Sequence, residues 1–148
     1  MPGMKIWLTV LVLSAVALGC NSTKKSFEVE VTNQTNTPVT LWLMKDGPPS
    51  EEGWRSPEEL ALLPEGSPRN YDLAFVKPGR TGYTPRLSGE FPGGTHAVLR
   101  VYEGEKELFH ILQETRAGTV KRIDHRLRPG KNRLNLVDRS GQMTLESR

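Results

Sequence analysis

Short runs of alternating apolar and polar residues, separated by Gly, Pro, Asn and Asp, fill most of the chain from Phe27 onward. In the first run, Phe27, Val29 and Val31 alternate with glutamate and threonine. Successive side chains of a strand point to opposite faces, so this run predicts a β-strand with one buried face. Residues 39–44 (VTLWLM) are largely apolar on both faces, which is typical of a central strand.

Seven further runs predict strands, at 71–76, 86–91, 96–102, 107–113, 119–127, 132–137 and 143–146. Glycine-containing turn sequences such as Pro129-Gly130 and Ser140-Gly141 separate them. The most economical architecture is all-β, an antiparallel β-sandwich of about eight strands. The strand, turn and strand at 127–136 resemble the closing hairpins of extracellular β-sandwiches, which implies an Ig-like or transthyretin-like arrangement.

One short helix interrupts the strand pattern between residues 46 and 68. Ser56 precedes Pro57, a residue favoured at the first helical position, and Glu59 follows three residues after the serine. This spacing predicts a capping box and a helix over residues 57–63, ended by Pro64.

Two leucines of this predicted helix share one face. Leu60 and Leu63 are three residues apart, so both can cover an edge or end of the sheets. Trp54, just upstream, is the packing partner that we expect for them.

The beginning of the chain has a different character. Residues 6–18 (IWLTVLVLSAVAL) form an uncharged apolar run of 13 residues between Lys5 and Gly19. The run has the length of a signal-peptide core, whereas a helix that spans a bilayer needs about 20 apolar residues. We therefore expect a signal peptide over residues 1–19, translated from Met1 or from Met4.

A single cysteine follows this run directly. The sequence Ala17-Leu18-Gly19-Cys20 resembles the lipobox of bacterial lipoproteins. The resemblance covers residues 1–20 and implies that Cys20 carries diacylglycerol, which would hold the protein to a membrane through its acyl chains. Asn21 is not the aspartate that commonly retains such lipoproteins in the inner membrane, so the resemblance favours the outer membrane. The alternatives are an ordinary secreted protein and an uncleaved membrane anchor.

The rest of the chain suits one folded domain. We expect residues 20–26 to be the lipidated cysteine and a polar tether, and residues 27–148 to be a single β-sandwich domain. Cys20 is the only cysteine, so packing rather than a disulfide must stabilise the domain. From Cys20 onward there are 19 basic and 17 acidic residues, and this balance argues against nucleic acid as a partner.

Residue patterns of enzymes and metal sites are missing from the sequence. His96, His110 and His125 stand singly in the predicted strands, without a second histidine at ligand spacing. There is no Gly-x-Ser-x-Gly motif, and the paired glutamates lie in predicted loops or at the helix start. The glycine-rich residues 79–82 lack the lysine of a phosphate loop and predict a turn. We expect no catalytic residues, no metal and no cofactor.

Aromatic side chains offer a second route to ligand binding. Trp42, Tyr71 and Tyr102 fall in predicted strands, which favours a structural role, whereas Trp54 and Tyr83 fall in predicted loops.

The most uneven feature of the predicted domain is its charge between residues 121 and 133. Six basic residues occur there with one acid, Asp124: Lys121, Arg122, Arg126, Arg128, Lys131 and Arg133. Such a run is typical of a solvated face or of a protected sheet edge. The sharper interpretation is a docking surface for an anionic envelope polymer or an acidic protein.

Together these features predict an envelope lipoprotein that acts as a non-catalytic binding or structural module. The alternative is an accessory subunit of a secretion, transport or envelope-assembly complex, in which the β domain packs against another envelope protein.

Overall fold

A computed structural model describes residues 23–148, so Cys20 and the predicted signal peptide lie outside the described residues. In chain order the elements are β1 (Lys24–Asn33), β2 (Val39–Asp46), the 3-10 helix η1 (Glu52–Trp54), α1 (Pro57–Ala61), β3 (Ala74–Val76), β4 (Thr81–Tyr83), β5 (Leu87–Glu90), β6 (His96–Glu103), α2 (Leu108–Ala117), β7 (Arg122–Arg126), β8 (Gly130–Arg139) and β9 (Gln142–Ser147). Within residues 23–148, no helix combines the length and apolar character that crossing a membrane requires.

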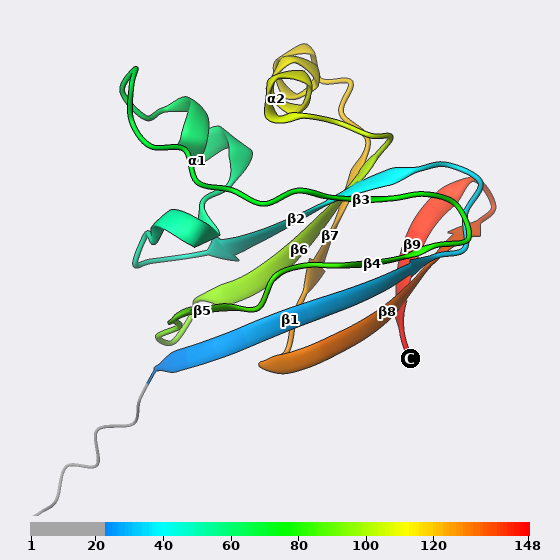
Figure 1. Ribbon diagram of the computed structural model, residues 1–148, viewed down its shortest axis with the longest axis horizontal. Coiled ribbons are helices and arrows are strands. Elements are labelled where there is room, and N and C mark those ends of the chain that lie inside the picture. Colours follow the sequence, from blue (N-terminus) through cyan, green and yellow to red (C-terminus); the bar gives the residue numbers. More distant parts are fainter. Residues whose placement is uncertain (1–22) are drawn as a thin grey trace, which may run out of the picture.

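The strands form two sheets that pack face to face (Figure 1). The five-stranded sheet has the order β4-β1-β8-β9, with β5 also paired to β1, and the four-stranded sheet has the order β3-β2-β6-β7. This confirms the predicted all-β sandwich. Uniformly antiparallel pairing is wrong at one place, because β1 and β8 run parallel. Side-chain alternation identifies the faces of a strand but not the direction of its neighbour.

The main core fills the space between the sheets. The predicted inward residues of β1 (Phe27, Val29 and Val31) are at most 2% exposed. They pack in one cluster with apolar residues of β2, β6 and β8. The alternation at the start of the chain's folded part therefore identified its buried face correctly.

Helices α1 and α2 lie over the outer face of the four-stranded sheet (Figure 1). A second apolar cluster fills the space beneath them. Its buried members are Trp42 and Met44 of β2, Val98 and Tyr102 of β6, Leu60 of α1 and Ile111 of α2. The molecule thus has a third, helical layer over one sheet. β2 lies between β3 and β6, as its two apolar faces predicted.

Helix α1 begins as expected. Ser56 Oγ accepts a hydrogen bond from the Glu59 backbone N–H (3.2 Å), and Glu59 Oε2 accepts one from the Ser56 backbone N–H (2.7 Å), so both halves of the capping box form. Leu60 is buried and Leu63 packs against the same cluster, which confirms their shared face. The helix ends earlier than predicted, at Ala61.

Trp54 does not pack with these leucines. It lies in the main core, where its ring meets those of Phe27 and Phe91 edge-on at centroid distances of 5.6 and 5.0 Å. Its indole N–H donates to the Ser88 carbonyl of β5 at 3.0 Å, which holds the side chain on the inner side of the sheet.

Helix α2 overturns the predicted strand at 107–113. Leu108 and Ile111 lie three residues apart, so a helix places them on one side, and both pack in the cluster on the sheet. Gly118 ends the helix in the left-handed conformation (φ 69°) that glycine adopts without strain. The run is also compatible with strand alternation, and the helical spacing is the one that the fold uses.

Two boundaries also differ from expectation. Strand β1 begins at Lys24 and pairs with β5 from its first residue, so the predicted tether through residue 26 is too long. Backbone pairing needs no apolar side chain, which is why hydropathy missed these residues. At residues 79–82, Gly79 and Arg80 form the predicted turn, but Thr81 and Gly82 already belong to β4.

Candidate functional site

The six cations of the predicted basic stretch do not share one surface. The residues that alternate with Arg122 and Arg126 in β7 pack against the main core or point toward it, so these arginines project from the outer face of the four-stranded sheet. By the same alternation, Lys131 and Arg133 of β8 project from the outer face of the five-stranded sheet. The two pairs therefore lie on opposite sides of the sandwich.

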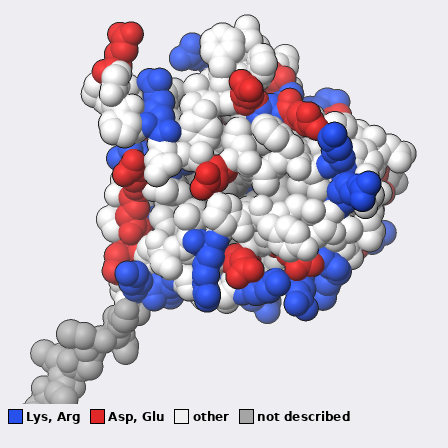
Figure 2. Space-filling view, in the orientation of Figure 1, with Lys and Arg blue, Asp and Glu red and all other residues white. Residues whose placement is uncertain are grey.

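Four of the six cations have acidic partners. The ion pairs are Lys121 Nζ–Glu103 Oε2 (3.6 Å), Arg122 Nη1–Glu58 Oε1 (3.2 Å), Lys131 Nζ–Glu30 Oε2 (3.4 Å) and Arg133 Nε–Glu30 Oε2 (3.7 Å). Arg126 and Arg128 have no such pair among the described residues. Figure 2 shows acidic and basic side chains interspersed over the face in view. This pairing supports the solvated-face interpretation of the basic stretch over a continuous docking surface.

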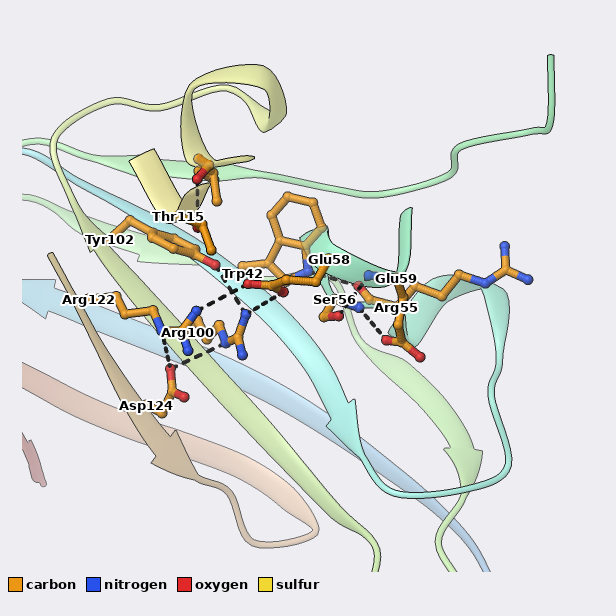
Figure 3. Close-up of polar contacts among 11 residues, drawn as sticks. Trp42, Arg55, Ser56, Glu58, Glu59, Arg100, Tyr102, Thr115, Arg122 and Asp124 are labelled. Atoms are coloured by element: carbon orange, nitrogen blue, oxygen red, sulfur yellow. Dashed lines mark hydrogen bonds and ion pairs between the residues drawn. The ribbon is translucent and has the colours of Figure 1, made fainter. Parts of the chain in front are cut away.

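A polar network on the outer face of the four-stranded sheet attaches α1 to β6 and β7 (Figure 3). Arg100 of β6 donates to Glu58 Oε2 at 2.8 Å and lies 3.5 Å from the Tyr102 hydroxyl. Arg122 of β7 pairs with the other oxygen of Glu58. Asp124 lies beneath both arginines, 3.4 Å from Arg100 Nε and 3.7 Å from Arg122 Nε.

Burial and neighbouring charges together shift the pKa values of Glu58 and Tyr102 in this network. Burial tends to raise the pKa of Glu58, but its own backbone N–H and the guanidinium groups of Arg100 and Arg122 outweigh burial and lower the pKa. Burial raises the pKa of Tyr102, so the phenol stays protonated at neutral pH. Glu58 therefore stays ionised between two cations, and the network fixes the position of α1 over the sheet.

A groove opens between α1 and α2, beside this network. It encloses about 480 Å³ and is lined by Leu60, Ala61, Arg69, Leu108, Phe109, Leu112, Gln113 and Arg116. Leu60 is fully buried and forms part of the floor, whereas Phe109 is 70% exposed. Neighbouring Leu62 is 85% exposed. Phe109 thus places a largely exposed aromatic ring beside a cavity of ligand size.

Sequence reasoning missed this groove because it assigned residues 107–113 to a strand. The signal that could have found it is the spacing of Leu108 and Leu112, with Arg116 one turn further along the same stripe.

The three histidines lie in three different elements, His96 in β6, His110 in α2 and His125 in β7. Within residues 23–148 no three His, Cys, Asp or Glu side chains lie close enough to hold a metal ion. His110 is exposed on α2, and burial lowers the pKa of His125 in β7. Tyr71 stacks on Trp42 at 5.2 Å, so this pair closes over the sheet rather than offering an open aromatic platform.

The fold and groove thus define a class, a sandwich-like all-β domain with a helical layer over one sheet and an apolar groove within that layer. Comparisons of the chain with protein-family models, with curated proteins and with solved structures found no match.

Proposed function

We propose that this protein is an envelope lipoprotein whose domain acts as a non-catalytic binding or structural module. The observation that carries the anchor is the apolar run of residues 6–18 ending at the only cysteine of the chain, Cys20. The outer membrane is the proposed location, on the basis of Asn21.

The start of β1 bears on how the domain would sit at the membrane. Thr23 already accepts a backbone hydrogen bond from Phe91, so the paired structure begins three residues after Cys20. Three residues reach at most about 11 Å when fully extended. A lipid on Cys20 would therefore hold the end of the sandwich at which β1 begins close to the headgroups.

The α1–α2 groove supports a binding role. Its lining is mostly aliphatic and aromatic, with two arginines and one amide, a composition that holds a ligand by burial and charge. The basic stretch supports an anionic-polymer partner less well, because its cations are divided between two faces and four of them are paired.

Metabolic labelling with a palmitate analogue tests the anchor. The native chain should take up the label, and Cys20→Ala should not. Ser22→Ala, two residues away, is the matched control and should be labelled like the native chain. Label on the Cys20→Ala chain, or none on the native chain, would contradict lipidation.

Sorting is tested separately by separating inner and outer membranes on a density gradient. The native chain should band with the outer membrane, and Asn21→Asp should move it toward the inner membrane. Co-sedimentation of the native chain with the inner membrane would contradict the proposed location.

A further inference from the structure

Helix α2 presents a stripe that changes from apolar to cationic along its length. Leu108, Phe109 and Leu112 stand toward its beginning, and Arg116 stands in its last turn. Eight residues of helix extend about 12 Å, so the stripe separates an apolar end from a charged end by that distance. One-ended charge is the property of an amphiphile rather than of a polar polymer.

The two arginines of the groove have no partners of their own. Neither the Arg69 nor the Arg116 guanidinium forms an ion pair or hydrogen bond with another described residue. By contrast, Arg100 and Arg122 on the same face of the sheet both pair with Glu58. The unpaired carbonyls at the C-terminal end of α2 favour a cation at Arg116 even without a ligand. Arg69 lies in the irregular segment after α1, where no helix end favours a cation. Two unpaired cations beside an apolar floor complement a ligand with an anionic head and a hydrocarbon body.

We propose that the α1–α2 groove binds one monomeric long-chain fatty acid. The hydrocarbon lies against Leu60, Leu108 and Leu112 beneath Phe109, and the carboxylate is held by Arg69 and Arg116. A guanidinium binds a carboxylate with paired, charge-assisted hydrogen bonds, which suits this head group. The groove volume of about 480 Å³ lies within the range of small-molecule sites.

This inference rests on the proposed binding role but not on the lipid at Cys20. The groove lies on the side of the sandwich, on the outer face of the four-stranded sheet, whereas the anchor would act at the end where β1 begins (Figure 1). A lipidated chain with an empty groove and an unlipidated chain with an occupied groove are therefore separate outcomes.

The test uses the full chain in bacterial cells fed a fatty acid that carries a terminal diazirine and an alkyne. Trypsin releases residues 56–69, which contain the α1 wall and Arg69, and residues 107–116, which contain the α2 wall. We expect light-dependent adducts on these two peptides. Lipidation of Cys20 needs no light, so label that appears without light on the peptide of residues 20–24 reports the anchor and not the groove.

Matched variants separate the groove from general stickiness. Arg69→Glu and Arg116→Glu together should lower the groove adducts by about tenfold, as expected for losing charge-assisted hydrogen bonds to the carboxylate. Because this variant lacks two tryptic sites, its adducts are counted on the longer peptides of residues 56–80 and 107–121. Arg80→Glu makes the same charge reversal in the exposed β3–β4 turn and should change nothing. Phe109→Asp should lower the adducts as well, while Tyr83→Asp, which replaces an aromatic residue that is 58% exposed in β4, should not.

Competition in isolated envelopes tests the head group. Excess dodecanoate should displace the probe, and dodecyltrimethylammonium, with the same chain and opposite charge, should not. Equal displacement by both would overturn the assignment of the two arginines.

The mass of the adduct identifies the source of the chain. An adduct with the mass of the free fatty acid supports the proposal. An adduct with the mass of a whole phospholipid would overturn it in favour of a membrane contact, and adducts spread equally over the peptide of residues 81–86 would overturn it in favour of non-specific labelling.

Discussion

Gly89 in β5 is a position where one methyl group should destabilise the fold strongly. Its backbone lies so close to η1 that a Cβ atom would stand 2.6 Å from the Trp54 indole nitrogen and 2.6 Å from a Glu51 carboxylate oxygen. The Glu51 side chain is partly exposed and can shift. Trp54 is 2% exposed and is enclosed by Phe27 and Phe91, so it has no free space to enter.

The cost of Gly89→Ala follows from these contacts. Forcing an extra carbon into a packed core costs about 1 to 3 kcal/mol. Moving the indole also breaks its 3.0 Å hydrogen bond to the Ser88 carbonyl, and a buried donor without a partner costs about 1 to 3 kcal/mol. If the indole shifts to relieve the overpacking, it loses the hydrogen bond, so the two costs do not simply add. We expect a loss of about 2 to 4 kcal/mol in the free energy of unfolding.

Gly53→Ala in η1 is the matched control. The nearest atom to its added Cβ is Leu87 Cδ2 at 3.7 Å, an ordinary contact, and its backbone suits alanine. Both substitutions restrict the unfolded chain equally, so Gly53→Ala should be neutral or stabilise by up to about 1 kcal/mol. In urea denaturation followed by tryptophan fluorescence, the Gly89→Ala midpoint should fall by about 1 M or more relative to this control. Coincident midpoints would refute the close approach of β5 and Trp54.

Further predictions concern the attachment of α1. Ser56→Ala should lower the free energy of unfolding by about 1 kcal/mol through loss of the N-cap, while Ser50→Ala, in the exposed loop before it, should have little effect; equal urea midpoints would contradict the cap. Glu58→Gln should destabilise the protein at pH 7 by about 1 kcal/mol or less, since Glu58 is partly exposed. Because folding lowers the pKa of Glu58, its ionised side chain stabilises the fold above the ordinary pKa of 4.5, and this contribution is lost as the pH falls through the lowered value. The native and Glu58→Gln midpoints should therefore approach each other as the pH is lowered below 4.5, and a difference that stays constant would refute the ion-pair account.

The strands that were predicted well are those whose alternation is tied to burial. Phe27, Val29 and Val31 of β1 and Leu134 and Leu136 of β8 enter the main core at alternate positions, so hydropathy alone identifies each element and its buried face. The capped start of α1 was predictable for a different reason, since Ser56, Pro57 and Glu59 act on their own backbone and need no tertiary partner.

Helix α2 was not predictable from alternation because its sequence satisfies two periods at once. All five residues from Leu108 to Leu112 are compatible with a strand, whose side chains would alternate between two faces. In the helix, only Ile111 of the five is fully buried. The choice is made by the sheet beneath it, where Ile111 completes the cluster around Trp42 and Tyr102. Tertiary packing therefore decided the element on which the candidate groove depends.

The basic stretch shows a similar limit for the site. Residues 121–133 are continuous in sequence, but the turn at Pro129-Gly130 carries the chain from the four-stranded to the five-stranded sheet. Cations on either side of that turn consequently face opposite directions. Charge density along a chain predicts a surface only when the residues belong to one sheet or one helix.

Strand β2 did contain information about the helical layer, in a form that we interpreted too narrowly. A strand in a two-layer sandwich buries one face and exposes the other, so residues 39–44, buried on both faces, require a cover on each side. Val39, Leu41 and Leu43 meet the opposite sheet, whereas Trp42 and Met44 need something else. The covering elements must come from segments without strand pairing, and α1 together with the residues after β6 are the segments that the topology leaves available. The doubly apolar strand thus implies a third layer, and the groove proposed to bind a fatty acid lies within that layer.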